Sequence, residues 1–177
     1  QELDQLSVNL LQLGGLVMDQ TEQAVAALTG RDEELARTVI EREKEVNAYD
    51  TRIEEMAVQL LAKRAPVGSD LRTVLAMLKA GTDLERAGDE AKKVAKLARS
   101  LTERNVPPAA PLVTRVESMT ALITAMLRDV LSALDNSDEA LAVTVAVGDK
   151  QVDREYRAAL ASMHEYLKHE GRDLHYV

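Results

Sequence analysis

The stretch VIEREKEVNAYDTRIEEMAVQLL, residues 39–61, places an apolar side chain at every seventh position. A seven-residue apolar repeat is typical of an α-helix that packs lengthwise against another helix. We therefore expect one long helix here, capped at its start by Asp32 and running to about Arg64, before Pro66 ends it. The repeating positions are Val39, Val46, Ile53 and Leu60.

The composition extends this prediction to the whole chain. Of the 177 residues 46% are hydrophobic, but only 2% are aromatic, and there are only eight glycines and four prolines. So few turn-forming residues cannot provide the turns between many short strands. An apolar core without large aromatic rings suits closely packed helices. We therefore predict an all-α protein.

The same signals predict the other helices. We expect them at residues 1–28, 70–104, 112–134 and 138–169, with Gly30 ending the first helix and Gly171 the last. Gly14 and Gly15 interrupt the first helical pattern and indicate a kink or a close contact between helices. The third helix is expected to be capped by Ser69 or Asp70. The stretch NVPPAAP, residues 105–111, is a rigid linker.

An internal repeat organises these helices. A shift of 106 residues places EKEVN (43–47) on DKQVD (149–153) and the turn at Gly30 on Asn136. Because long helices with short connections pack as antiparallel neighbours, we predict a tandem of antiparallel three-helix bundles. The first repeat would comprise residues 1–105, the linker 106–111 and the second repeat 112–177.

The second bundle is predicted to lack its last helix in this chain, because the shift places Leu71 on Val177. Two helices alone would leave an apolar groove. We expect a partner chain, the missing segment or partial disorder there, and an associated form of the protein, a homodimer.

Charge and motifs exclude several classes of function. The net charge of −8 argues against nucleic acid as a main partner, because phosphate binding depends on basic surfaces. There are no cysteines, no apolar run long enough to span a membrane and no signal-peptide pattern, so we expect a soluble, cytoplasmic protein. No common nucleotide-binding or hydrolase motif occurs, and the histidines, expected at exposed helix ends, do not suggest an enzyme. These are His164, His169 and His175.

The stretch TDLERAGDEAKK, residues 82–93, carries the main candidate for chemistry. Glu85 and Asp89 are four residues apart on one face of the predicted third helix, with Gly81 and Gly88 towards its core side. Paired carboxylates held near a second helix are suited to binding a hard cation through oxygen. Similar pairs occur on the second and fifth predicted helices. They are Glu43 with Asn47, and, at the repeat offset, Asp149 with Asp153.

An ordinary solvated surface is the alternative interpretation of the Glu85–Asp89 pair. In a chain with 29% charged residues, acidic pairs at this spacing also arise by chance. Arg86, Lys92 and Lys93 are close enough in sequence to neutralise the two carboxylates. Recurrence of the second-helix pair at the repeat offset favours the functional interpretation, because a random surface has no reason to repeat it.

Residues 66–98 resemble the signature helix of the PhoU family of phosphate-uptake regulators. The family pattern joins Asp70-Leu71-Arg72 at the helix start to Glu85-Arg86-Ala87-Gly88-Asp89 one helix length later. Ala87 stands where the family usually has Ile, and Glu90 where His is frequent. The segments LGGLV (13–17), VIEREKEVN (39–47) and DKQVDREY (149–156) also match in order, so the resemblance covers essentially the whole chain.

The resemblance implies a fold and a function. PhoU proteins are tandem three-helix bundles that act as non-enzymatic adaptors and negative regulators of the phosphate-starvation response. They are thought to link the ATPase of the phosphate ABC transporter to the phosphate-sensing histidine kinase. Family members carry metal clusters at acidic motifs, which here map onto Glu85 and Asp89 facing Glu43 and Asn47, with Asp149 and Asp153 in the second unit. Iron, zinc, manganese and magnesium are the candidate ions.

Two functions of other classes remain open from the sequence. One is a carboxylate-bundle protein that stores or oxidises iron, although no Glu-x-x-His spacing of the kind that such sites use occurs in the chain. The other is a helical scaffold without a ligand, in which the acidic pairs serve only solubility. A ferroxidase assay and co-purification with the transporter ATPase or the sensor kinase would separate these alternatives from the adaptor.

Overall fold

The structure, a computed structural model, describes residues 2–170 as five α-helices with no strand among them, which confirms the predicted all-α class. Gly171 and His175, for which helix ends were predicted, lie outside the described residues, as does the side chain of His169. No described helix combines the length and the apolar character needed to cross a membrane. The helices are α1 (Glu2–Gly30), α2 (Glu33–Arg64), α3 (Gly68–Glu103), α4 (Ala110–Asn136) and α5 (Glu139–Glu170).

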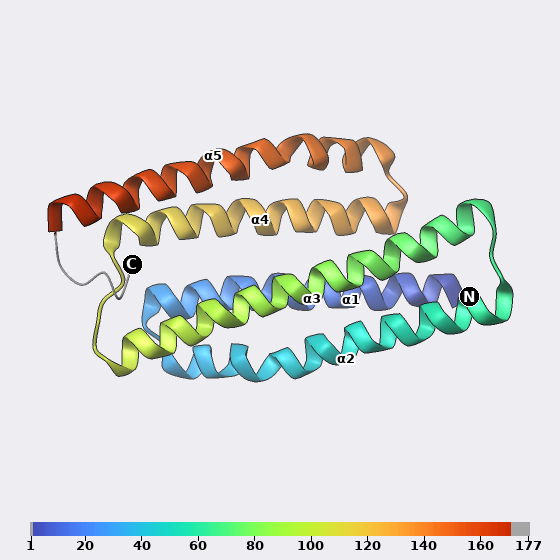
Figure 1. Cartoon of the computed structure of the whole chain (residues 1–177), viewed down its shortest axis with the longest axis horizontal. Coiled ribbons are helices and arrows are strands. Elements are labelled where there is room, and N and C mark those ends of the chain that lie inside the picture. Colours follow the sequence, from blue (N-terminus) through green and yellow to red (C-terminus); the bar gives the residue numbers. More distant parts are fainter. Residues whose placement is uncertain (1, 171–177) are drawn as a thin grey trace.

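Helices α1, α2 and α3 form a bundle in which each helix packs against the other two (Figure 1). The predicted seven-residue repeat of α2 faces inward, and its four residues are at most 8% exposed, which confirms that prediction. Burial of each such aliphatic side chain contributes about 1.5–3 kcal/mol before entropic losses. Val46, Ile53 and Leu60 of this repeat share one core cluster with a matching stripe on α1. The α1 residues are Leu6, Leu10, Leu13 and Val17.

The turn between α1 and α2 recurs between α4 and α5, at the offset predicted from the sequence. A carboxylate oxygen of Asp32 accepts a hydrogen bond of 2.9 Å from the backbone N–H of Leu35, and Asp138 accepts one of 3.0 Å from Leu141. Both aspartates are helix N-caps of the preferred type. The residue before each cap has a positive φ, and these residues are Arg31 and Ser137.

The start of α3 differs from the sequence prediction. Neither Ser69 nor Asp70 caps the helix, because both lie inside its first turn, where the Ser69 hydroxyl lies 3.4 Å from a carboxylate oxygen of Asp70. The N-cap is Val67, which has no side-chain capping bond. Gly68 has a φ of +61°, a left-handed conformation that glycine adopts without strain. This allows the helix to begin directly after Val67.

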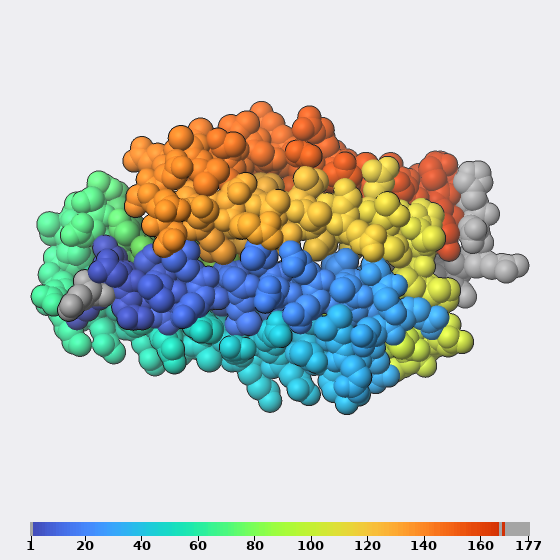
Figure 2. All heavy atoms as spheres, turned by 180° about the vertical axis from the view of Figure 1, so that it is seen from behind, coloured from blue at the N-terminus to red at the C-terminus, as the bar shows by residue number. Residues whose placement is uncertain are grey.

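Helix α4 attaches the α4–α5 hairpin to the first bundle by packing along α1 (Figure 2). The close approach depends on Gly14, because a Cβ atom there would lie 2.4 Å from a methyl carbon of Leu131. A Cβ on Gly15 would have no neighbour within 4 Å. Helix α1 continues through both glycines, and the predicted close contact between helices is found at Gly14.

Helix α5 contacts only α4 among the described helices. Several of its large apolar side chains are consequently exposed, as expected for a two-helix unit. Nothing in the described residues covers this surface, and the predicted occupants of the groove stay predictions. The exposed side chains on α5 are Val143, Val147, Tyr156 and Leu160.

Candidate functional site

The main candidate site lies between α2 and α3. Glu85, Asp89 and Lys92 are spaced at i, i+4 and i+7 on α3, so they share one face of that helix. This face is turned toward Glu43 on α2, to which Lys92 is ion-paired. All four side chains are half-buried. The Glu85–Asp89 pair therefore faces a neighbouring helix instead of projecting into open solvent.

Two glycines allow α2 and α3 to approach each other closely at this site. A Cβ on Gly81 would lie 3.2 Å from a methyl carbon of Ile53, and a Cβ on Gly88 would lie 3.0 Å from one of Val46. A Cβ atom at either position would be in tighter contact than usual, so the facing side chain of α2 would have to shift by a few tenths of an ångström. This confirms that both glycines lie on the core side of α3.

The ammonium group of Lys92 is ion-paired with the Glu43 carboxylate across the two helices. The side chains are only 20% and 21% exposed, respectively. Hydrogen bonding to Lys92 is the largest effect on Glu43 and lowers the pKa of its carboxyl, although burial acts in the opposite direction. The positive charge of Lys96 lowers this pKa further.

The remaining carboxylates of the site repel one another. Burial is the main cause that raises the pKa of Glu85, followed by the negative charges of Asp89, Asp50 and Glu43. Burial and the nearby Glu54 raise the pKa of Asp50, one of whose carboxylate oxygens is buried without a hydrogen-bond partner. We call Glu43, Asp50, Glu85 and Asp89 the carboxylate cluster. Its negative charge exceeds the positive charge that Lys92 supplies.

The donor chemistry of the carboxylate cluster suits a hard cation, because carboxylate oxygens are the ligands that Mg²⁺ and Ca²⁺ prefer. The unpartnered oxygen of Asp50 and the repulsion around Glu85 also favour a further positive charge. However, the described residues contain no group of three or more histidines and acids arranged to hold a metal ion. The cluster thus contains carboxylate oxygens of a suitable type, but they are not arranged around a common metal position.

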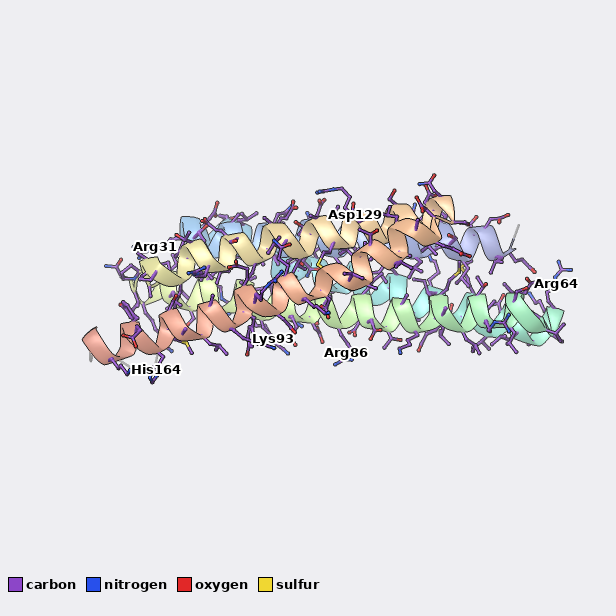
Figure 3. The ribbon with its side chains drawn as sticks, turned by 90° about the horizontal axis from the view of Figure 1, so that it is seen from above. Arg31, Arg64, Arg86, Lys93, Asp129 and His164 are labelled. Atoms are coloured by element: carbon purple, nitrogen blue, oxygen red, sulfur yellow. The ribbon has the colours of Figure 1, made fainter. Side chains whose placement is uncertain are left out.

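Two of the three basic residues near the pair are exposed and form ion pairs with acids other than Glu85 and Asp89. Arg86 and Lys93 project from the outer side of α3 (Figure 3). They pair with acids on the same helix, Arg86 with Asp83 at 3.7 Å and Lys93 with Glu90 at 2.7 Å. Only Lys92 reaches across to the neighbouring helix.

Three of the predicted site residues are exposed, unlike the half-buried carboxylate cluster. Asn47 is exposed on α2. Asp149 and Asp153 are exposed on α5, which faces only α4, and Asp153 lies 3.9 Å from Arg157 one turn further along. His164 is exposed near the far end of α5, as predicted (Figure 3).

The sequence analysis missed one buried polar residue near the site. Gln20 is fully buried on α1, and its side-chain amide donates a hydrogen bond of 3.2 Å to the backbone carbonyl of Val39. Its other amide atom, Oε1, has no partner and lies beside Gly88. The spacing contained the signal, because Gln20 falls three residues after Val17 and four before Ala24 on the apolar stripe of α1.

Comparison with known protein families gives a match over most of the chain. The family model described as the PhoU domain matches residues 10–98 and 116–177. These two segments cover most of α1–α3 and of α4–α5, respectively.

Curated relatives and solved structures agree with that match. The phosphate-specific transport system accessory protein PhoU homolog of Pseudomonas putida is 38% identical over 98% of this chain and 67% of its own length. The corresponding Escherichia coli protein is 35% identical over 98% of this chain and 70% of its own length. The crystal structure of PhoU from Pseudomonas aeruginosa is similar with a TM-score of 0.92 and 37% identity, covering 99% of this chain and 83% of that one. The crystal structure of PhoU from Streptococcus pneumoniae is similar with a TM-score of 0.83 and 32% identity, covering 94% of this chain and 77% of that one.

Proposed function

The chain belongs to the PhoU family of phosphate transport accessory proteins, and on that premise we propose that it is a non-enzymatic, cytoplasmic adaptor that restrains phosphate uptake when phosphate is plentiful. The observation that carries this proposal is the family match along both helical units, with relatives named for the phosphate-specific transport system. Its proposed partners are the ATPase of the phosphate ABC transporter and the phosphate-sensing histidine kinase.

The surface of the protein suits a role in protein contact. Its long helices present extended faces, and α5 exposes large apolar side chains such as Val143 and Val147, which are 64% and 65% exposed. Large apolar surfaces of this kind are typical of interaction sites. We propose that the protein also associates with itself as a homodimer, which sedimentation analysis at several concentrations would test.

The adaptor role is tested with purified partners from the same organism. We expect the protein to bind the transporter ATPase or the cytoplasmic part of the sensor kinase in a calorimetric titration, with an unrelated ABC ATPase as the control. In cells that lack their own PhoU protein, expression of this chain should lower a phosphate-responsive reporter under phosphate-replete growth. Absence of binding to both partners together with an unchanged reporter would contradict the proposal.

We further propose that the first unit binds a metal ion, with Glu43, Glu85 and Asp89 as ligands and Asp50 close by. Iron, zinc, manganese and magnesium are all compatible with carboxylate oxygen. Asn47, Asp149 and Asp153 stay predicted ligands, and their exposure supports them less than the clustered carboxylates. No observation on the described residues favours the iron-storage alternative.

Elemental analysis of the purified protein and of its Glu85→Gln variant tests the metal proposal. We expect bound metal in the wild-type protein and a clear loss of it in the variant. A metal-free wild-type protein whose stability and partner binding are unchanged by Glu85→Gln would contradict a metal role.

A further inference from the structure

We infer that the homodimer forms through the outer side of α5, where a second copy of the chain packs antiparallel to the first. The inference rests on the proposed homodimer and names the surface and the orientation through which it forms. Helix α5 lies at one edge of the molecule and contacts only α4 among the described helices (Figure 1). Its outer side is therefore available to a second copy.

A line of residues with the spacing of a coiled-coil seam runs along this outer side. The spacing alternates between three and four residues, which keeps the side chains on one side of the helix. Every residue of the line is exposed, including Val143 at 64% and Leu160 at 41%. We call these residues the α5 seam, and they are Val143, Ala146, Lys150, Asp153, Arg157 and Leu160.

The α5 seam is complementary to itself when two copies lie antiparallel. Its residues are placed symmetrically about a midpoint between Gln151 and Val152. A two-fold axis at this midpoint brings Val143 of each copy to Leu160 of the other. These apolar contacts occur at both ends of the paired helices, and the burial of exposed apolar area favours association.

The charges in the middle of the α5 seam select the antiparallel orientation. There, Lys150 of each copy faces Asp153 of the other, so the two-fold axis produces two pairs of opposite charge. The Asp153 carboxylate is available for this, because its contact with Arg157 is long, at 3.9 Å, and both side chains are more than 60% exposed. Arg157 itself faces the small Ala146 of the other copy. Parallel helices would instead place Lys150 beside Lys150, and like charges in contact disfavour that arrangement.

The α5 seam lies apart from the side of the helix that a third helix would cover. In the first unit, α3 packs on α2 at Val46 and Ile53, whose equivalents at the repeat offset are Val152 and Ala159. The α2 equivalents of the charged seam residues stay exposed although α3 is in place. They are Lys44, Asn47 and Thr51. A helix packed on α5 in the same way would therefore leave the seam free.

The apolar ends of the seam are a feature of the second unit. On α2, the positions equivalent to Val143 and Leu160 are occupied by Arg37 and Glu54, which are exposed. Charged residues at these positions keep the outer side of α2 in contact with water. Their replacement by apolar residues on α5 is what an interface requires.

Charge reversal within the α5 seam tests the inference by analytical ultracentrifugation of the full chain. Lys150→Asp should weaken dimerisation at least about tenfold, because it turns two attractive contacts into two repulsive ones. Lys150→Asp combined with Asp153→Lys exchanges the charges and should restore the wild-type dissociation constant. Lys44→Asp, the same change at the repeat-equivalent position of α2, is the matched control and should leave dimerisation unchanged.

Disulfide trapping tests the orientation, because the chain contains no cysteine of its own. A mixture of Val143→Cys and Leu160→Cys chains should form a covalently linked mixed dimer in oxidised glutathione. Either chain alone should stay unlinked, since antiparallel packing separates like positions by about 25 Å along the helix axis. Linkage of Val143→Cys chains on their own would indicate parallel packing and overturn the inference.

The ultracentrifugation results separate this inference from the proposals on which it rests. A wild-type protein that is monomeric at every concentration would overturn both the inference and the proposed homodimer, while the adaptor role would still stand on its partner titration. A wild-type dimer that Lys150→Asp does not weaken would overturn the inference alone. The same conclusion would follow if the charge exchange failed to restore dimerisation.

Discussion

The two units of the molecule share a sequence pattern and a turn but differ in burial. In α1–α3 the repeated apolar residues are buried, with Val39 and Val46 at most 1% exposed. Their equivalents at the repeat offset, Val145 and Val152 on α5, are only half-buried. The difference arises because α1 and α2 pack against α3, whereas α5 contacts only α4. An apolar pattern selects the face of a helix, and a neighbouring helix is still required to bury it.

The largest expected effect compares matched core positions of the two units. Val46→Ala should lower the free energy of unfolding by about 2–3 kcal/mol, because it removes two buried methyl groups and leaves a cavity between α2 and α3. Val152→Ala, its repeat equivalent, should cost no more than about 1 kcal/mol. Urea denaturation of both variants measures the difference. Equal losses would show that the second unit is packed as tightly as the first.

A second prediction concerns the contact that joins the units. Gly14→Ala should destabilise the protein by about 1–2 kcal/mol, since the new methyl group overlaps Leu131 on α4. Gly15→Ala is the matched control, and it should be neutral or stabilising, because its Cβ meets nothing and alanine favours the helix.

Leu131→Ala combined with Gly14→Ala tests whether the overlap itself causes the loss. The double variant should be destabilised by less than the sum of the two single variants in a double-mutant cycle. Additive effects would mean that α1 and α4 are not held together at Gly14.

The third prediction compares the equivalent helix caps. Asp32→Ala and Asp138→Ala should each cost about 1 kcal/mol of local helix stability, because each aspartate accepts a hydrogen bond from a backbone N–H of the first turn. The readout should differ between the units. Asp32→Ala should lower global stability, whereas Asp138→Ala should mainly increase amide hydrogen exchange at the start of α5. A global loss of equal size at both caps would argue against this difference.

The smallest expected effect concerns Asp50, which has no acidic equivalent in the second unit, where Tyr156 stands at the repeat offset. Burial and Glu54 raise the pKa of Asp50 in the folded state. Folding is therefore favoured by protonation of Asp50, and stability is lost as the pH rises through its folded pKa. Asp50→Asn removes this loss and should stabilise the protein at pH 7 by less than about 1 kcal/mol.

The gain from Asp50→Asn should vanish below the ordinary aspartate pKa of 3.8, where the wild-type carboxyl is protonated in both the folded and the unfolded state. Denaturation series at pH 3 and pH 7 measure this. Glu54→Gln should give a smaller effect of the same sign. A gain from Asp50→Asn that is independent of pH would contradict the electrostatic explanation.

Much of the fold could be read from local patterns. The repeat of Val39, Val46, Ile53 and Leu60 predicted the buried face of α2, because it depends only on helical periodicity. Asp32 was also recognised as a cap, because its capping hydrogen bond joins residues within one helical turn. Ser69 and Asp70 were wrongly predicted as caps, because Gly68 can adopt a left-handed conformation that lets α3 begin earlier.

The candidate site was predicted less completely. The spacing of Glu85 and Asp89 indicated a shared face, and Gly81 and Gly88 indicated a close neighbour, as found. From the sequence, Arg86, Lys92 and Lys93 were equally good candidates for neutralising the two carboxylates. Of these three, only Lys92 forms an ion pair with a residue of α2. That choice depends on the distance and rotation of α2 relative to α3, which no pattern within α3 contains.

The sequence by itself determined the helices, the apolar face of each and the recurring turn, since all of these follow from periodicity and from hydrogen bonds between residues close in the chain. Only the tertiary structure decided which faces are covered, which carboxylates lie together and which lysine compensates them. These features depend on contacts between residues far apart in sequence, such as Glu43 with Lys92 or Gly14 with Leu131. Their energies arise only when packing sets the separation of the helices.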